Sequence, residues 1–209
     1  HKNDLYPFRY QELTGGELAE LIRSELVEKL TGPSADYNLV FTTNGIACTT
    51  ASLIAATQGH ATLDSITEAD VPAIRDAHLL LAAFNAWQPG VFALSGWDLL
   101  GALTLPRGDV ADLIADGDTR WIERGAHDLL GVAPDQERSA SGMPRARSLY
   151  GTLPDQLKRR DSFASGLRDL LRIRSKYGIA SARQVDVPDV AHPGMLVLVH
   201  ELETLDEQG

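Results

Sequence analysis

Two short groups of polar and aromatic residues carry side chains that suit chemistry on a sugar. The first is 42–45 (Thr-Thr-Asn-Gly), at the end of an apolar run, and the second is 95–98 (Ser-Gly-Trp-Asp), at the end of another. An indole stacks on the apolar face of a pyranose, while amides and carboxylates hydrogen-bond its hydroxyls. We therefore single out Asn44, Trp97 and Asp98 as candidate substrate-binding residues. A simpler interpretation makes Asn44-Gly45 a plain turn and Asp98 a helix cap.

Other motifs with a known chemistry do not fit. The phosphate-binding patterns G-x-x-x-x-G-K-[ST] and G-x-G-x-x-G are absent. A hydrolase elbow around Ser95 needs glycine two residues before and two after it, where Ala93 and Trp97 stand. The segment 116–118 (Asp-Gly-Asp) lacks the later glycine and glutamate of a calcium loop. We expect no metal and no cofactor.

The histidines and the single cysteine favour structural roles. No two of the six histidines have a compact ligand spacing, which argues against a zinc site. His78 falls on the apolar face of a predicted helix, where a satisfied packing residue is the better interpretation. Cys48 lies among small residues and is interpreted as packing rather than as a nucleophile.

The elements that would position these groups alternate along the chain. Helical spacing of apolar residues predicts helices after the capping box of Thr14 and Glu17, from about Thr67 to Trp87, and from Ser162 to Gly178. The runs 38–42 and 91–94 read as short buried strands, and 46–58 as a short helix. Residues 1–14 are expected to form a polar loop. The order helix, strand, helix, strand predicts a parallel sheet covered by helices.

The second half of the chain changes character twice. From Gly96 to about residue 160 a long excursion, with a small helix near 110–114, suits a functional or flexible loop. After Gly178, the segments 181–187 and 195–202 predict two strands joined by a turn, which need a larger β-layer because an isolated hairpin is marginal.

Composition narrows the partners. The formal net charge of −10 over 209 residues disfavours nucleic acid and anionic membranes, and no apolar stretch is long enough to span a bilayer. One cysteine and no export signal favour the cytoplasm. The chain opens without a methionine, as in mid-loop, so we expect a fragment or processed piece. Oligomeric state stays open, including a homo-oligomer.

Three stretches resemble the α-amylase superfamily of glycoside hydrolases, and trehalose synthases (maltose α-D-glucosyltransferases) within it. YNLVFTTNGIACTT (37–50) is similar to the seventh strand of that family's barrel. AHLLLAAFNAWQPGVFALSGWDLLG (77–101) is similar to its seventh helix and eighth strand, and the segment 161–178 to its eighth helix. The resemblance implies an α/β fold: 1–178 as the end of a (β/α)8 TIM barrel, and 179–209 as the start of an antiparallel β-domain.

The departures from the family pattern decide where catalysis would lie. The family's seventh strand usually ends in F-x-x-N-H-D, and here Phe41 and Asn44 match, but Gly45 and Ile46 replace the His and Asp. The nucleophile and acid/base of the family belong to strands that would precede His1. The resemblance therefore implies no catalytic residue in this chain, and places the two carboxylates of a retaining enzyme upstream.

The resemblance implies an enzyme that isomerises maltose to trehalose by retaining, intramolecular glucosyl transfer. The expected partner is a small sugar: maltose, trehalose or a related α-glucoside. Three alternatives stay open. They are another retaining α-glucosidase or glucosyltransferase of the superfamily, a non-catalytic sugar-binding or interaction domain, and an unrelated complete α/β protein.

Overall fold

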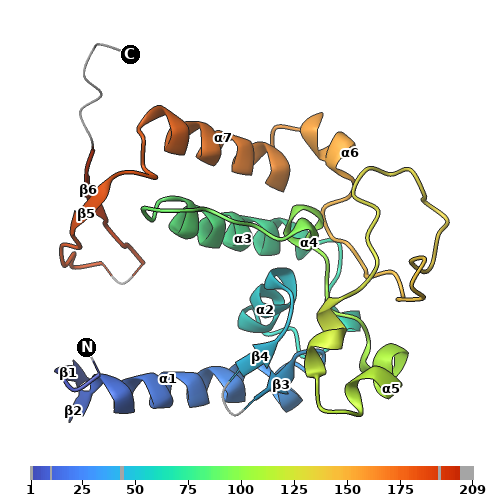
Figure 1. The fold of residues 1–209 in the computed structure, drawn as a ribbon, viewed down its shortest axis with the longest axis horizontal. Coiled ribbons are helices and arrows are strands. Elements are labelled where there is room, and N and C mark those ends of the chain that lie inside the picture. The colour runs from blue at the N-terminus through green and yellow to red at the C-terminus, as the bar shows by residue number, and fades with distance from the viewer. Residues whose placement is uncertain (1, 10, 43–44, 193, 203–209) are drawn as a thin grey trace.

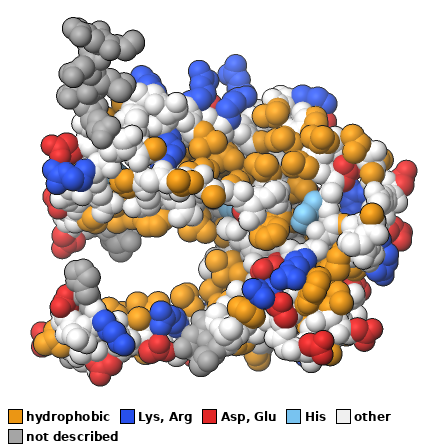
Figure 2. Space-filling model, viewed as in Figure 1, with side chains coloured by type: hydrophobic (Ala, Val, Ile, Leu, Met, Phe, Trp, Pro, Cys, Tyr) orange, Lys and Arg blue, Asp and Glu red, His pale blue; other side chains and the backbone are white. Residues whose placement is uncertain are grey.

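Four helices stacked one on the next form the frame of the molecule. The computed structural model describes residues 2–9, 11–42, 45–192 and 194–202. The stack runs α1 (Gly15–Leu30), α2 (Thr50–Thr57), α3 (Val71–Ala86) and α7 (Phe163–Lys176), with each helix in contact with its neighbour. Because α2 is short, α1 and the α3–α7 pair extend beyond it as two arms (Figure 1). The space between the arms stays open when all side chains are drawn (Figure 2).

The long helices begin and end where their sequence signals predict. Thr14 and Glu17 form the expected capping box at the start of α1, with the Thr14 N–H donating to Glu17 Oε2 at 2.9 Å. Ser162 Oγ accepts from the Ser165 N–H at the start of α7. Gly178 follows that helix with a φ of +59°, the left-handed conformation that glycine adopts without strain. All three predicted long helices are confirmed.

Short helices and turns make up much of the long excursion from Gly96 to about residue 160. They are α4 (Gly96–Leu100), α5 (Ala111–Ile114) and α6 (Leu153–Leu157), with 3-10 turns at Arg107–Val110 and Thr119–Glu123. Further 3-10 turns lie at Gly32–Ser34 and Leu63–Ser65. The small helix expected near 110–114 is confirmed by α5. The excursion is a folded part of the core, because Leu103, Leu105 and Ile122 are each only 1% exposed.

Three two-stranded sheets, all antiparallel, make up the β-structure of the described residues. They pair β1 (Leu5–Phe8) with β2 (Gln11–Thr14), β3 (Leu39–Phe41) with β4 (Gly45–Ala47), and β5 (Arg183–Asp186) with β6 (Val199–Glu201). The C-terminal hairpin confirms the two strands predicted there. The N-terminal hairpin contradicts the predicted polar loop over 1–14.

The described residues do not pair the two predicted strands in a parallel sheet. The first run does form a strand, β3, but it turns back at once and pairs with β4 in an antiparallel hairpin. The second run, 91–94, has no regular secondary structure. A strand exists only where a neighbour accepts its backbone hydrogen bonds, and no described strand lies in register with 91–94. Val91, at its start, is 98% exposed. No closed barrel forms from the described residues.

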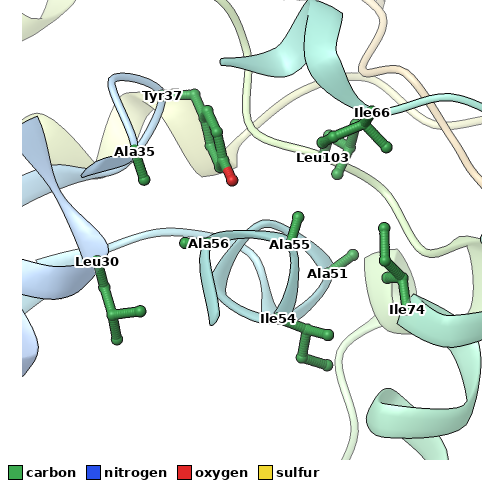
Figure 3. Packing of buried hydrophobic residues seen from close by; sticks show 10 residues of the cluster. All are labelled: Leu30, Ala35, Tyr37, Ala51, Ile54, Ala55, Ala56, Ile66, Ile74 and Leu103. Carbon is green, nitrogen blue, oxygen red and sulfur yellow. The ribbon is translucent and has the colours of Figure 1, made fainter. Parts of the chain in front are cut away.

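The interior is divided among three apolar clusters. The first lies between α1, α2 and the start of α3 (Figure 3): Leu30, Ala35, Tyr37, Ala51, Ile54, Ala55, Ala56, Ile66, Ile74 and Leu103. The second gathers residues of β4, α4 and the excursion: Ala47, Leu100, Ala102, Leu105, Val110, Ile122 and Ala146. The third joins α3 to α7 through Ala82, Tyr150, Phe163 and Leu167.

Two stripes of exposed apolar side chains, one on α1 and one on α3, extend from the first cluster. On α1, buried Leu30 is preceded at helical spacing by Leu26 and Ile22, which are 46% and 43% exposed. On α3, Ala77 packs on the cluster, and Leu81 and Phe84 follow at helical spacing, 37% and 43% exposed. Figure 2 shows hydrophobic side chains along both arms where they border the gap. A hollow of about 1,030 Å³ lies over α1, beside Leu18 and Ile22.

The total surface area shows how incomplete this packing is. The chain exposes 13,237 Å², whereas a compact monomer of 22.7 kDa exposes about 9,500 Å² by the usual scaling of area with mass. Allowing the twelve undescribed residues the exposure of a fully extended chain, about 160 Å² each, still leaves an excess of roughly 1,800 Å². That excess is about twice the roughly 800 Å² that one partner buries in a standard protein interface.

Candidate functional site

The structure places two of the three predicted substrate-binding residues side by side in the first turn of α4. Trp97 is partly buried and packs on the second cluster, as do Leu39 and Phe41 of β3. The tip of the first predicted strand and the indole of Trp97 therefore belong to one region of the core. Asn44, the third predicted residue, lies outside the described residues.

Asp98 is a buried helix-capping residue. Its side chain is 8% exposed, and Oδ2 accepts the Ser95 N–H at 3.0 Å, which with the Ser95 side chain completes a capping box at the start of α4. The simpler interpretation of Asp98 as a helix cap is thus confirmed. With Oδ2 held by the backbone, the carboxylate fixes the turn that carries Trp97.

A second, longer-range contact completes the surroundings of Asp98. His78 of α3 is 1% exposed, and its Nε2 lies 3.4 Å from Asp98 Oδ1, at an angle that falls short of a hydrogen bond. The other ring nitrogen, Nδ1, lies 3.1 Å from Tyr150 Oη. The imidazole also packs on Phe163, with ring centres 4.4 Å apart. This agrees with the interpretation of His78 as a satisfied core residue.

Sequence reasoning missed Tyr150 entirely. Its hydroxyl meets a histidine 72 positions earlier, and no local spacing signals such a contact. The one available hint was the glycine at position 101, which has a φ of +57°. A Cβ placed there would lie 2.5 Å from Tyr150 Cε2, so the aromatic ring requires the bare backbone of Gly101.

Two opposing effects act on the Asp98 carboxyl. Burial alone would raise its pKa, but the polar side chains of His78 and Thr50 and the Ser95 N–H outweigh burial and hold the pKa below its ordinary value. Asp98 is therefore a carboxylate at neutral pH. Burial, with the charge of Asp98, raises the pKa of Tyr150 well above its usual range, so its hydroxyl keeps its proton and can donate it.

The lowered pKa of Asp98 predicts a pH dependence of stability. A carboxyl with a folded-state pKa below its unfolded value stabilises the fold fully above the unfolded value, near 3.9, and loses that contribution as pH falls through the folded-state pKa. We expect Asp98→Asn to flatten the acid side of a stability–pH profile measured by urea unfolding between pH 7 and pH 3. An unchanged slope in the variant would contradict the assignment. Asp109→Asn, an exposed change outside the cluster, is the control.

Other candidate groups are committed to structural contacts. Burial, with the charge of Glu123, raises the pKa of the Cys48 thiol to about 12, so it is not an activated nucleophile. Asp118, in the segment tested as a calcium loop, is bonded to Arg120 and lies 3.6 Å from Arg124. Within the described ranges, no three His, Cys, Asp or Glu side chains gather to hold a metal ion.

A small polar hollow of about 340 Å³ adjoins Tyr150. It is lined in part by Glu68, Arg75, Arg159 and Asp161. Arg75 donates to the Asp161 carbonyl, and Arg159 Nε lies 3.5 Å from the Asp161 carboxylate. Because these charges already neutralise one another, the hollow defines no charge for a ligand.

Comparison with known proteins yields no relative from which to read a function. No protein-family model, no curated protein and no solved structure matches this chain. Of the helices that the structure describes, none has both the length and the apolar character needed to cross a lipid bilayer.

Proposed function

We propose that this chain is one part of a carbohydrate-active enzyme of the α-amylase type, in which it forms the end of the catalytic barrel and one wall of the sugar site. The reaction is the isomerisation of maltose to trehalose in the cytoplasm. Further polypeptide supplies the catalytic carboxylates and the rest of the barrel. We call the protein or assembly that contains all of these parts the complete enzyme.

The observation that carries this proposal is the pair of exposed apolar stripes on α1 and α3. Both begin in the buried first cluster and run out of it along the facing arms. Helices stabilised by packing need their apolar face covered, because isolated helices of this length are marginal in water. Together with the excess surface area, the stripes support a chain whose core is completed by other structural elements.

The position of Trp97 supports the sugar-site part of the proposal. It follows a segment that resembles the eighth barrel strand, and active sites of such barrels lie at the carboxyl ends of their strands. The unpaired backbone of 91–94 suits a strand whose neighbours lie in the further polypeptide, since a strand flanked on both sides would find its hydrogen-bond partners there.

The proposed chemistry divides the work between the two parts. A carboxylate of the further polypeptide attacks the anomeric carbon of maltose, and a second carboxyl protonates the departing glucose. The freed glucose turns within the closed site and attacks the glucosyl-enzyme through its own anomeric hydroxyl. Two displacements retain the configuration of the transferred carbon. Trp97 holds a sugar ring during that turn, and the folded excursion keeps water out.

We predict that Trp97→Ala in the complete enzyme raises KM for maltose roughly tenfold, because an aromatic contact of about 1.4 kcal/mol corresponds to a factor of ten. Trp97→Phe keeps an aromatic face and should lose much less. Trp87→Ala removes a partly exposed indole at the end of α3 and serves as the matched control. The measurement is trehalose and glucose formation from maltose, with thermal unfolding of each variant to check that the fold survives.

Two results would contradict the proposal. One is isomerisation of maltose by this chain when purified alone, since this chain would then contain the whole active site. The other is a complete enzyme in which the upstream coding sequence holds no strand–helix units with Asp and Glu at the strand ends. Product analysis on maltose and on sucrose separates trehalose formation from another glucosidase or glucosyltransferase activity.

A further inference from the structure

Trp97 sits on a helix too short to orient it. The five residues of α4 form little more than one helical turn, and such a segment has almost no stability of its own. Its geometry must therefore be imposed from outside. The structure shows three ties: one at the start of α4, one at its end, and one from α3 to its first turn.

The tie at the end of α4 comes from the chain around Tyr150. The Tyr150 N–H donates to the Leu100 carbonyl at 3.0 Å, and the Leu149 N–H donates to the Gly101 carbonyl at 3.2 Å. The Tyr150 ring fills the space beside Gly101 and stacks on Phe163, with ring centres 5.3 Å apart. Tyr150 is 6% exposed and Phe163 0%, so the C-terminal end of α4 rests on a rigid aromatic pair.

The tie at the start of α4 is Asp98, whose Oδ2 accepts the Ser95 N–H. Its other oxygen lies 3.4 Å from His78 Nε2, and neither of these two atoms has a hydrogen-bond partner among the described residues. A buried carboxylate oxygen without a donor would be costly. The proton of a neutral His78 therefore belongs on Nε2, facing Asp98, which leaves Nδ1 to accept the Tyr150 hydroxyl.

We propose that Tyr150, His78 and Asp98 form a buried positioning set that fixes the orientation of Trp97. The set is directional: the Tyr150 hydroxyl donates to His78 Nδ1, and His78 Nε2–H points to Asp98. It joins both ends of α4 to α3 through one imidazole. The contact of Trp97 with a sugar rests on the proposed function. The dependence of its orientation on these three residues is independent of that function.

The test uses a chain in which Trp97 is the single tryptophan, made by Trp87→Phe and Trp121→Phe. In that background we expect Tyr150→Phe and His78→Gln to raise acrylamide quenching of Trp97 fluorescence by roughly twofold or more, because loss of the ties lets α4 open locally. Tyr37→Phe is the matched control, since it also removes a buried hydroxyl, one that donates to the His60 carbonyl at 2.8 Å, far from α4 in the sequence.

Non-additivity separates a connected set from simple packing. Because Tyr150 and Asp98 act through the same imidazole, the double change Tyr150→Phe with Asp98→Asn should quench no more than the worse single change. Long-range proton–nitrogen correlation spectra should place the His78 proton on Nε2. Additive quenching effects, quenching equal to the Tyr37→Phe control, or a neutral ring protonated on Nδ1 would each overturn the proposal.

The outcomes also distinguish this proposal from the proposed function. If quenching responds as expected but Trp97→Ala leaves the KM for maltose unchanged in the complete enzyme, the positioning set stands and the sugar role of Trp97 fails. If KM responds and quenching does not, the sugar role stands and the positioning set fails.

Discussion

Replacing Arg174 with alanine should lower the free energy of unfolding by about 3–5 kcal/mol, the largest effect we expect from one substitution, because it leaves one buried and two part-buried carbonyls without their donor. Arg174 lies in the last turns of α7 and is 8% exposed. Its guanidinium donates to the carbonyls of Ala86, Gln88 and Gly90, where α3 ends and the chain turns.

The physical reason is that Ala86, the last residue of α3, is buried. The last carbonyls of a helix have no intrahelical partner and carry the negative end of its dipole. One guanidinium, with donors spread over a rigid fork, satisfies the Ala86 carbonyl of α3 and the Gln88 and Gly90 carbonyls of the turn after it, and it also fixes α7 against α3. A lysine carries its charge at a single point and cannot span all three, so Arg174→Lys should recover only part of the loss.

Urea unfolding of the purified chain measures the effect. Arg172→Ala, two residues earlier on an exposed part of the same helix, is the control and should change stability by no more than about 0.5 kcal/mol. A loss of stability in Arg174→Ala no greater than in Arg172→Ala would show that the three carbonyls find water or other donors. Arg174 would then contribute little to the stability of the fold.

The helices were predictable because their signals are local. Thr14 and Glu17 stand three residues apart and can satisfy one another's backbone without help from the rest of the chain. Gly178 supplies the left-handed conformation that ends α7 wherever that helix packs. Such signals are read from a few neighbouring letters, and the structure confirms each of them.

The strands were harder to predict because pairing is not local. The run 91–94 has the composition of a buried strand, yet a strand also needs a neighbour, which its own letters do not encode. The hairpin of β1 and β2 was missed for a different reason. It turns at Arg9, which has a φ of +57°, so the turn lacks the glycine or asparagine that usually announces a hairpin.

In the candidate site, too, the local features were predictable and the contacts between residues distant in sequence were not. Asp98 as a helix cap follows from its place three residues after Ser95, and that interpretation was available from the sequence. Its contact with His78, and the contact of His78 with Tyr150, join residues 20 and 72 positions apart. Only the packing of α3 against the residues around α4 brings them together, so the buried set could not be foreseen from spacing.

The second large effect concerns the apolar stripe of α1. We expect the double change Ile22→Glu with Leu26→Glu to leave the isolated chain as stable as before, within about 0.5 kcal/mol, because both side chains are already exposed there. In the complete enzyme the same change should abolish assembly and activity. Under the proposed function each residue is buried there, and burying a side chain of this size contributes about 1.5–3 kcal/mol that a glutamate cannot replace.

The contrast between the two settings is what makes the experiment decisive. Urea unfolding and binding of a dye for exposed apolar surface report on the isolated chain, in which the dye signal should fall as the stripe becomes charged. Maltose isomerisation and size-exclusion chromatography report on the complete enzyme. Ser24→Glu adds a charge to the exposed opposite side of α1 and is the control in both settings.

Each pattern of results has one physical meaning. Loss confined to the complete enzyme means that α1 packs its stripe against further polypeptide, as a barrel wall must. Loss in neither setting means that Ile22 and Leu26 face water throughout, so the gap between the arms is a true surface and the proposed barrel has no place for its remaining units.

A second copy of this chain would also cover the stripe. Size-exclusion chromatography of the unmodified chain alone distinguishes this self-association from packing against further polypeptide. A monomer with exposed apolar surface favours completion by a different part of the enzyme, whereas a stable dimer whose association the double change abolishes would show that the chain completes its own core.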